Sequence, residues 1–192
     1  MSVAPCRIGI VGSAGVGKSS LGFELARMLR VPFLAAKEIT KDILKTDHYD
    51  YASGVQVERF LAQCGRQERI AEATIDLQCS FGQFVTDRTV IDLAAYAVAE
   101  MQSTPGIVEG IVDLCRANAG IYTHLVLCPW GERPIGDNQL RTLNPWYQFA
   151  IHSLDMGFLA QWNLAYYVVQ ADGSSERAKE VVGNLLGGDS RS

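Results

Sequence analysis

The sequence predicts an α/β fold with three layers, in which a mostly parallel five-stranded sheet is flanked by helices. Two observations support this prediction. Short apolar runs alternate with longer amphipathic stretches along almost the whole chain, which is typical of parallel strands covered on both faces. In addition, a glycine-rich turn joins the first apolar run to the first amphipathic stretch.

Five apolar runs have the length of strands. They are Arg7–Val11, Val31–Leu34, Phe84–Asp87, Thr123–Cys128 and Tyr166–Gln170. The third run ends in an acidic residue, which places a carboxyl group at the edge where open parallel sheets bind ligands.

Helices are predicted between these runs, because apolar residues recur there at helical spacing. The predicted ranges are about Lys18–Arg30, Lys37–Lys45, Val55–Cys79, Ile91–Met101, Gly106–Ala117, Trp146–Gln161 and Ser175–Leu186. Two segments read instead as loops, since they are rich in turn residues: Asp47–Gly54 and Pro129–Pro145. The second is a candidate lid at about 129–145.

The composition is that of one folded domain spanning 1–192: the chain has 192 residues, of which 48% are hydrophobic and 20% charged. The net charge of −4 gives no overall attraction to nucleic acid or anionic lipid. We find no secretory signal and no apolar stretch of membrane length. The five cysteines are scattered without metal-binding spacing, so we expect reduced, mostly buried thiols. These features predict a cytoplasmic protein without a membrane partner.

The run GSAGVGKS matches the pattern of a phosphate-binding P-loop, G-x-x-x-x-G-K-[ST], and lies between a predicted strand and a predicted helix. In that setting the glycines let the backbone turn several N–H groups toward phosphate oxygens. We therefore expect a P-loop NTPase fold that binds ATP. The residues expected to bind the nucleotide are Gly12, Ser13, Ala14, Gly15, Val16, Gly17, Lys18, Ser19 and Ser20.

Two side chains of this loop have expected roles in catalysis. Lys18 would reach the β and γ phosphates, and the Ser19 hydroxyl would bind Mg²⁺. Asp87, at the end of a predicted buried strand, would either complete the Mg²⁺ site or act as the base for the acceptor hydroxyl. Its neighbour Arg88 would neutralise charge on the transferred phosphoryl group. The alternative interpretation of Asp87 is the N-terminal cap of the following helix.

The runs GSAGVGKSS and DRTVIDLAAY resemble those of small P-loop kinases. This group includes deoxynucleoside and nucleoside monophosphate kinases, viral deoxynucleotide kinases and the kinase domain that phosphorylates nicotinamide riboside. In the group, an acidic residue and an Arg after the third strand precede an Asp and then an aromatic residue. Asp87, Arg88, Asp92 and Tyr96 match this order. The resemblance covers most of the chain and implies a cofactor pair of ATP and Mg²⁺.

The resemblance also suggests residues for the acceptor site, within a region of about 35–70. Gln67, with Arg66 as the alternative, matches a position used against the acceptor base. Asp92 and Tyr96 would either line the acceptor pocket or lie on the surface of the helix. Glu38, near the end of the second predicted strand, resembles the base used on a sugar hydroxyl. Many nucleoside monophosphate kinases have an Arg in that region instead, so whether the acceptor already carries a phosphate stays open.

Arginines in the candidate lid would close over the phosphates, as in the kinases that the segment resembles. Arg141 is expected to stabilise the transition state and Arg133 to bind the nucleotide. A closing lid excludes water, which would otherwise compete as an acceptor.

The sequence thus predicts transfer of the γ-phosphate of ATP to a nucleoside, nucleoside monophosphate or similar small molecule. One alternative is a kinase acting on a hydroxymethylpyrimidine base within viral DNA, in which case the compartment would be the host cytoplasm. The other is a regulatory ATPase switch without an acceptor, although no N-K-x-D run is present. A homodimer is possible through the helices in 91–117.

Overall fold

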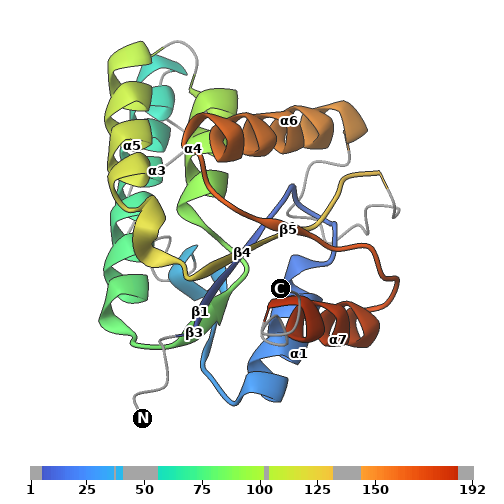
Figure 1. Cartoon of the computed structure of the whole chain (residues 1–192). Helices are drawn as coiled ribbons and strands as arrows, with labels where there is room; N and C mark the ends of the chain where they lie inside the picture. The colour runs from blue at the N-terminus through green and yellow to red at the C-terminus, as the bar shows by residue number, and fades with distance from the viewer. Residues whose placement is uncertain (1–5, 37, 41–55, 102–103, 132–143, 186–192) are drawn as a thin grey trace.

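The fold is a five-stranded, fully parallel sheet with helices on both faces, as Figure 1 shows for the computed structural model. The structure describes residues 6–36, 38–40, 56–101, 104–131 and 144–185. The strands are β1 (Arg7–Val11), β2 (Phe33–Leu34), β3 (Phe84–Thr86), β4 (His124–Leu127) and β5 (Tyr167–Val168). Their order across the sheet is β2-β3-β1-β4-β5, so β1 lies at the centre. The predicted fold class is confirmed.

The helices are longer than the strands and lie between them along the chain. They are α1 (Lys18–Leu29), α3 (Gln56–Ser80), α4 (Val90–Glu100), α5 (Pro105–Ala117), α6 (Pro145–Gln161) and α7 (Ser174–Leu185), with a 3-10 helix η1 (Ala119–Ile121) before β4. Most predicted boundaries agree to within one or two residues. The η1 turn was not predicted, because three residues are too few for a periodic pattern.

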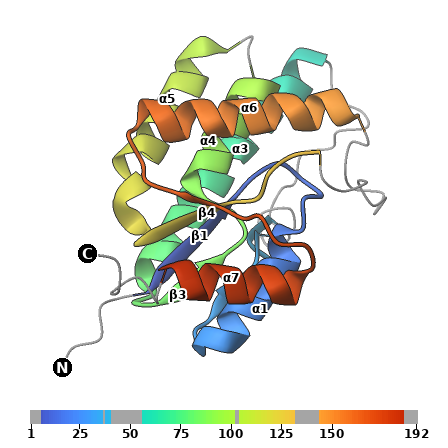
Figure 2. The ribbon, with the colours of Figure 1, turned by 45° about the vertical axis from the view of Figure 1, so that its right-hand side comes forward.

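The two faces of the sheet bury separate apolar clusters, because side chains alternate along each strand. Ile8 and Ile10 of β1 face α1 and α7, where they pack with Leu21, Leu25 and Val181. Val11 belongs to the larger cluster, formed with α3, α4, α5 and α6. Figure 2 shows α1 and α7 together on one side of the sheet and α4, α5 and α6 on the other.

Gly9 in β1 allows α4 to begin very close to the central strand. A Cβ atom there would lie 2.7 Å from Cγ2 of Thr89 and 2.8 Å from the ring of Tyr122. Thr89 is the N-terminal cap of α4, so this close approach fixes where the first turn of α4 lies relative to the end of β1.

Two further expectations concern the chain as a whole. All five cysteines are free thiols, and three of them, Cys64, Cys115 and Cys128, are buried. Among the helices of the described residues, none combines the length and the apolar character needed to cross a membrane. The loop predicted at Asp47–Gly54 and most of the helix predicted at Lys37–Lys45 lie outside the described residues.

Candidate active site

The loop between β1 and α1 has the backbone of a phosphate-binding nest. Gly12, Gly15 and Gly17 have φ angles of 141°, 90° and 90°, which side chains with a Cβ atom rarely adopt. At Gly12 a Cβ atom would also lie 2.7 Å from the carbonyl oxygen of Cys128. Glycine is therefore required at this position for two reasons, the backbone angle and the contact with the end of β4.

Lys18 folds back over this loop. Its ammonium group contacts the carbonyl oxygen of Gly12, donates to the carbonyl oxygen of Ser13 at 3.0 Å, and lies 3.5 Å from Oδ1 of Asp92. The Lys18 side chain is only 12% exposed, and the Asp92 side chain is fully buried. Lys18 is thus held over the P-loop by two backbone carbonyl oxygens and one buried carboxylate.

Asp92 connects the first turn of α4 to the P-loop. One oxygen, Oδ2, accepts hydrogen bonds from the N–H and the hydroxyl of Thr89, at 2.8 and 2.6 Å, which completes a capping box. The other oxygen, Oδ1, accepts from the N–H of Gly12 at 3.2 Å and faces Lys18. Asp92 was expected either to line the acceptor pocket or to lie on the helix surface. It lies instead behind the phosphate-binding loop.

Ser19, in the first turn of α1, is paired with Asp87, which directly follows β3. The Ser19 hydroxyl donates to Oδ2 of Asp87, and the other carboxylate oxygen accepts from the N–H of Ala36 at 2.8 Å. The alternative role of Asp87 as a cap of α4 does not apply, because the cap is Thr89. A hydroxyl and a carboxylate oxygen in contact match the few oxygen ligands that Mg²⁺ takes from proteins beside phosphates and water. The residues present fit a Mg²⁺ ion.

Helix α6 adds polar residues to the site that the sequence analysis did not identify. The side chain of Gln148 is buried, and its Oε1 accepts from the N–H of Ala14 in the P-loop at 2.9 Å. Asp155, two turns later on the same helix, is completely buried, and neither of its oxygens has a hydrogen-bond partner in the described part of the chain. The burial of Asp155 could have been predicted from the sequence, because this residue lies on the apolar face of the predicted helix, four residues after Ile151 and three before Phe158.

Helix α7 supports the P-loop from the other face of the sheet. The guanidinium group of Arg177 is almost fully buried and donates to the carbonyl oxygens of Val16, at 3.0 Å, and of Ala171, at 2.8 Å. Arg177 therefore orients the peptide group of Val16 from behind. The sequence analysis did not identify it either, because a single Arg on a helix gives no local indication of burial.

The expected acceptor residues Gln67 and Tyr96 lie near Arg88, which was expected to be catalytic, and near two residues that were not predicted. The Arg88 guanidinium stacks over the ring of Tyr96, at 4.8 Å from its centroid. Gln67 donates to Oε2 of Glu100 at 2.8 Å, and the hydroxyl of Tyr147 donates to Oε1 of the same carboxylate at 2.7 Å. Burial and the Glu100 carboxylate raise the pKa of Tyr147 well above its usual value. We call Gln67, Arg88, Tyr96, Glu100 and Tyr147 the acceptor cluster.

The remaining predicted residues are placed as follows. Ser20 is exposed in the first turn of α1, Arg66 is partly buried on α3, and Glu38 is exposed after the end of β2. Arg133 and Arg141 lie outside the described residues, as does most of the candidate lid.

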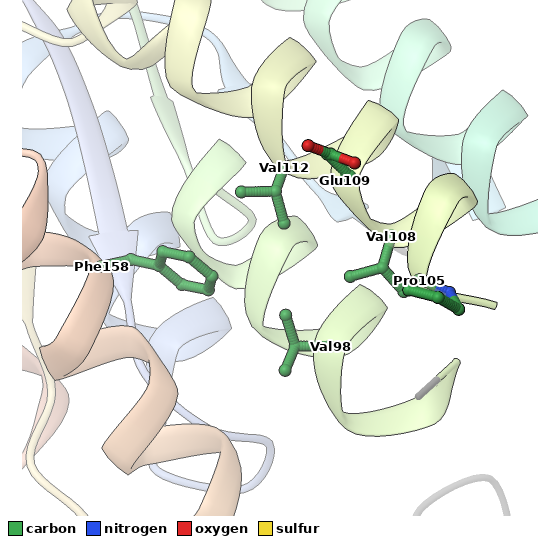
Figure 3. Close-up of a pocket in the computed structure, with 6 residues that line it drawn as sticks. All are labelled: Val98, Pro105, Val108, Glu109, Val112 and Phe158. Atoms are coloured by element: carbon green, nitrogen blue, oxygen red, sulfur yellow. The ribbon is translucent and has the colours of Figure 1, made fainter. Parts of the chain in front are cut away.

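A separate hollow opens between α4, α5 and α6 (Figure 3). Its lining is apolar except for one residue and consists of Val98, Pro105, Val108, Glu109, Val112 and Phe158. None of these residues belongs to the phosphate site or the acceptor cluster.

The arrangement of the site defines the class of protein. A parallel sheet whose central strand leads through a glycine nest into a helix, with a lysine, a serine and a carboxylate beside the nest, is a P-loop nucleotide-binding fold. The chain belongs to the AAA domain family, whose model matches residues 7–177. No curated protein sequence matches the chain.

Solved structures with this fold include several small kinases. Deoxyadenosine kinase from M. mycoides, determined with dCMP and dCDP bound, superposes with a TM-score of 0.63 at 13% identity, over 94% of this chain and 98% of that one. NadR in complex with NR superposes with a TM-score of 0.62 at 18% identity; the match covers 96% of this chain and 52% of NadR. Shikimate kinase from Acinetobacter baumannii superposes with a TM-score of 0.55 at 14% identity, over 97% of this chain and 96% of that one. At these identities the likeness confirms the expected P-loop kinase fold.

Proposed function

We propose that the protein is a kinase that transfers the γ-phosphate of Mg-ATP to a small nucleoside-like acceptor. The observation that carries the proposal is the meeting of Lys18, Ser19 and Asp87 at the ends of β1 and β3, next to the acceptor cluster. A nucleotide switch would need Lys18, Ser19 and Asp87, but it would not need an acceptor cluster. The kinase folds that superpose on the chain add support.

In this proposal each residue acts mainly by position and charge, as is general for phosphoryl transfer. The P-loop amides and Lys18 bind the phosphates, and Ser19 and Asp87 hold Mg²⁺. A bound Mg²⁺ ion neutralises charge on the phosphate oxygens. Arg88, on the acceptor side of the phosphates, stabilises the transferred group. The exposed Glu38 accepts the proton of the acceptor hydroxyl, and Arg141 and Arg133 close from the lid.

The acceptor cluster is suited to recognising a polar, flat group such as a base. Glu100 offers two carboxylate oxygens, Gln67 an amide that both donates and accepts, and Tyr96 and Tyr147 aromatic faces. In the structure Gln67 and Tyr147 donate to Glu100. An acceptor with N–H or O–H donors would take over one of these hydrogen bonds.

The test is ADP release from Mg-ATP with a panel of acceptors: nucleosides, nucleoside monophosphates, nicotinamide riboside and hydroxymethylpyrimidine-containing duplex DNA. Lys18→Ala is the inactive variant, and Lys179→Ala, which removes an exposed lysine on α7, is the matched control. Stimulation by one small acceptor, lost only in Lys18→Ala, supports the proposal and identifies the substrate. Stimulation by the DNA alone would favour a base kinase. Slow ADP release that no acceptor changes would favour a regulatory ATPase.

A further inference from the structure

Arg177 is a buried cation that the mechanism above does not use. The residue is 1% exposed. It lies on the face of α7 that also carries Ala178 and Val181, which are fully buried in the apolar cluster shared with α1. Burying a guanidinium group costs free energy, and an apolar residue at this position would extend the cluster without that cost. The presence of an arginine here needs an explanation other than packing.

The guanidinium group of Arg177 joins two loops at the carboxyl edge of the sheet. Its Nη1 donates to the carbonyl oxygen of Val16 in the P-loop at 3.0 Å, and its Nε donates to the carbonyl oxygen of Ala171, after β5, at 2.8 Å. Both nitrogens belong to one rigid, planar group, so the position of one donor fixes the position of the other. Ala171 is itself held by α7, because its N–H donates to Oε2 of Glu180 at 2.7 Å. The guanidinium group is therefore fixed relative to both loops.

The hydrogen bond to Val16 determines the direction of the next N–H group in the P-loop. Among the described residues no peptide bond is cis. In a trans peptide the C=O group and the N–H group that follows it point in opposite directions. Because the carbonyl oxygen of Val16 accepts from Arg177, the N–H of Gly17 points away from Arg177. Gly17 is the N-cap of α1, and N–H groups at the N-terminus of a helix bind anions.

The charge of Arg177 strengthens the same N–H group. A guanidinium group in a protein is always protonated. Hydrogen bonds in a chain polarise one another, so a cation that donates to the C=O of a peptide makes its N–H a stronger donor. A phosphate oxygen bound to Gly17 would complete such a chain. We propose that Arg177 is a positioning residue for the phosphate site: through the carbonyl oxygen of Val16, it directs and strengthens the N–H of Gly17 as a phosphate donor.

This inference rests on the proposed nucleotide site, and two variants separate it from a packing role. Arg177→Lys keeps the positive charge, but an ammonium group is a point donor and cannot reproduce the planar group that spans both carbonyl oxygens. Val181→Ala, one turn later on the same buried face of α7, leaves a cavity in the apolar cluster and removes no polar contact. Both variants should unfold at a lower temperature than the wild type, but only Arg177→Lys should alter the phosphate site.

Titration calorimetry with Mg-ADP compares these variants with the wild type. Arg177→Lys should bind Mg-ADP about tenfold more weakly, the loss expected for one hydrogen bond that involves a charged group. Val181→Ala should bind Mg-ADP with the wild-type affinity. An equal loss of affinity in both variants would leave Arg177 with a packing role only. Wild-type affinity in a folded Arg177→Lys protein would overturn the proposal as well.

An NMR experiment on the ¹⁵N-labelled full chain tests whether Arg177 acts through Gly17. Saturating Mg-ADP should shift the amide proton of Gly17 downfield in the wild type, because this N–H gains a phosphate acceptor, and the shift should be smaller in Arg177→Lys. A wild type that binds Mg-ADP without any change at Gly17 would overturn the proposal, and this result needs no variant to fold. Failure of the wild type to bind Mg-ADP at all would instead remove the proposed function itself.

Discussion

The phosphate side and the acceptor side of the site are built in different ways. On the phosphate side, Gly12–Ser19 form one continuous loop whose glycines impose the backbone, and other elements only brace it. On the acceptor side, Gln67, Glu100 and Tyr147 come from α3, α4 and α6, and each depends on how those helices pack. Chemistry shared by all nucleotide-binding relatives can reside in a local loop, whereas selectivity for one acceptor is assembled from distant elements.

The largest effect on activity is expected for Lys18→Ala, on the phosphate side. We expect kcat to fall by about 10²–10³-fold, because removal of one preorganised charge at a transferring phosphate has effects of that size. Thermal unfolding should change much less than kcat, since contacts from Asp92, Gln148 and Arg177 also hold the loop backbone in place. Steady-state kinetics with the best acceptor, beside Lys179→Ala, makes the measurement. A fully active Lys18→Ala enzyme would contradict the assignment of the phosphate side.

The second prediction concerns Asp87→Asn, which keeps the size of the side chain but weakens a Mg²⁺ ligand. The activity should fall by roughly 10²-fold, a typical loss when one electrostatic contact at the reacting group is removed. The Mg²⁺ concentration for half-maximal activity should rise as well. A magnesium titration at saturating ATP measures both effects. If the Mg²⁺ requirement were unchanged, Asp87 would act as the base rather than as a ligand.

The third prediction separates the two sides. Glu100→Gln removes the charge that Gln67 and Tyr147 contact, so the acceptor KM should rise by about tenfold, the value of one charge-assisted hydrogen bond. The KM for ATP should stay the same. Glu109→Gln, in the apolar hollow of Figure 3, is the matched control and should change neither constant. A parallel rise in the KM for ATP would show that the two sides are not independent.

The smallest effect is expected at Thr89, where α4 begins beside the P-loop. Thr89→Ala removes the cap of α4 and should lower the free energy of unfolding by about 1 kcal/mol. Asp92 loses one of its donors in this variant, the Thr89 hydroxyl, and keeps the N–H of residue 89. Urea denaturation measures the loss of stability. No loss of stability would mean that the capping box contributes little to α4.

The difference between the two sides also explains what could be predicted from the sequence. The sheet, its helices and the P-loop follow from periodicity and one local motif, and the described structure confirms the fold. Asp87 and Asp92 were identifiable because they follow a buried strand. Gln148 and Arg177 were not, because their roles depend on α6 and α7 reaching a loop more than 130 residues earlier in the chain. A periodic pattern predicts a helix and its buried face, but not which element that face meets.

The position of β1 at the centre of the sheet has a consequence for synthesis of the protein on the ribosome. Residues 7–11 leave the ribosome well before their partners, which are residues 84–86 on one side and 124–127 on the other. The strand that carries the phosphate loop is therefore fully paired only after most of the chain has been made. Until then the apolar residues Ile8, Ile10 and Val11 are without their sheet partners, so chaperone binding to the nascent chain should concentrate on this segment.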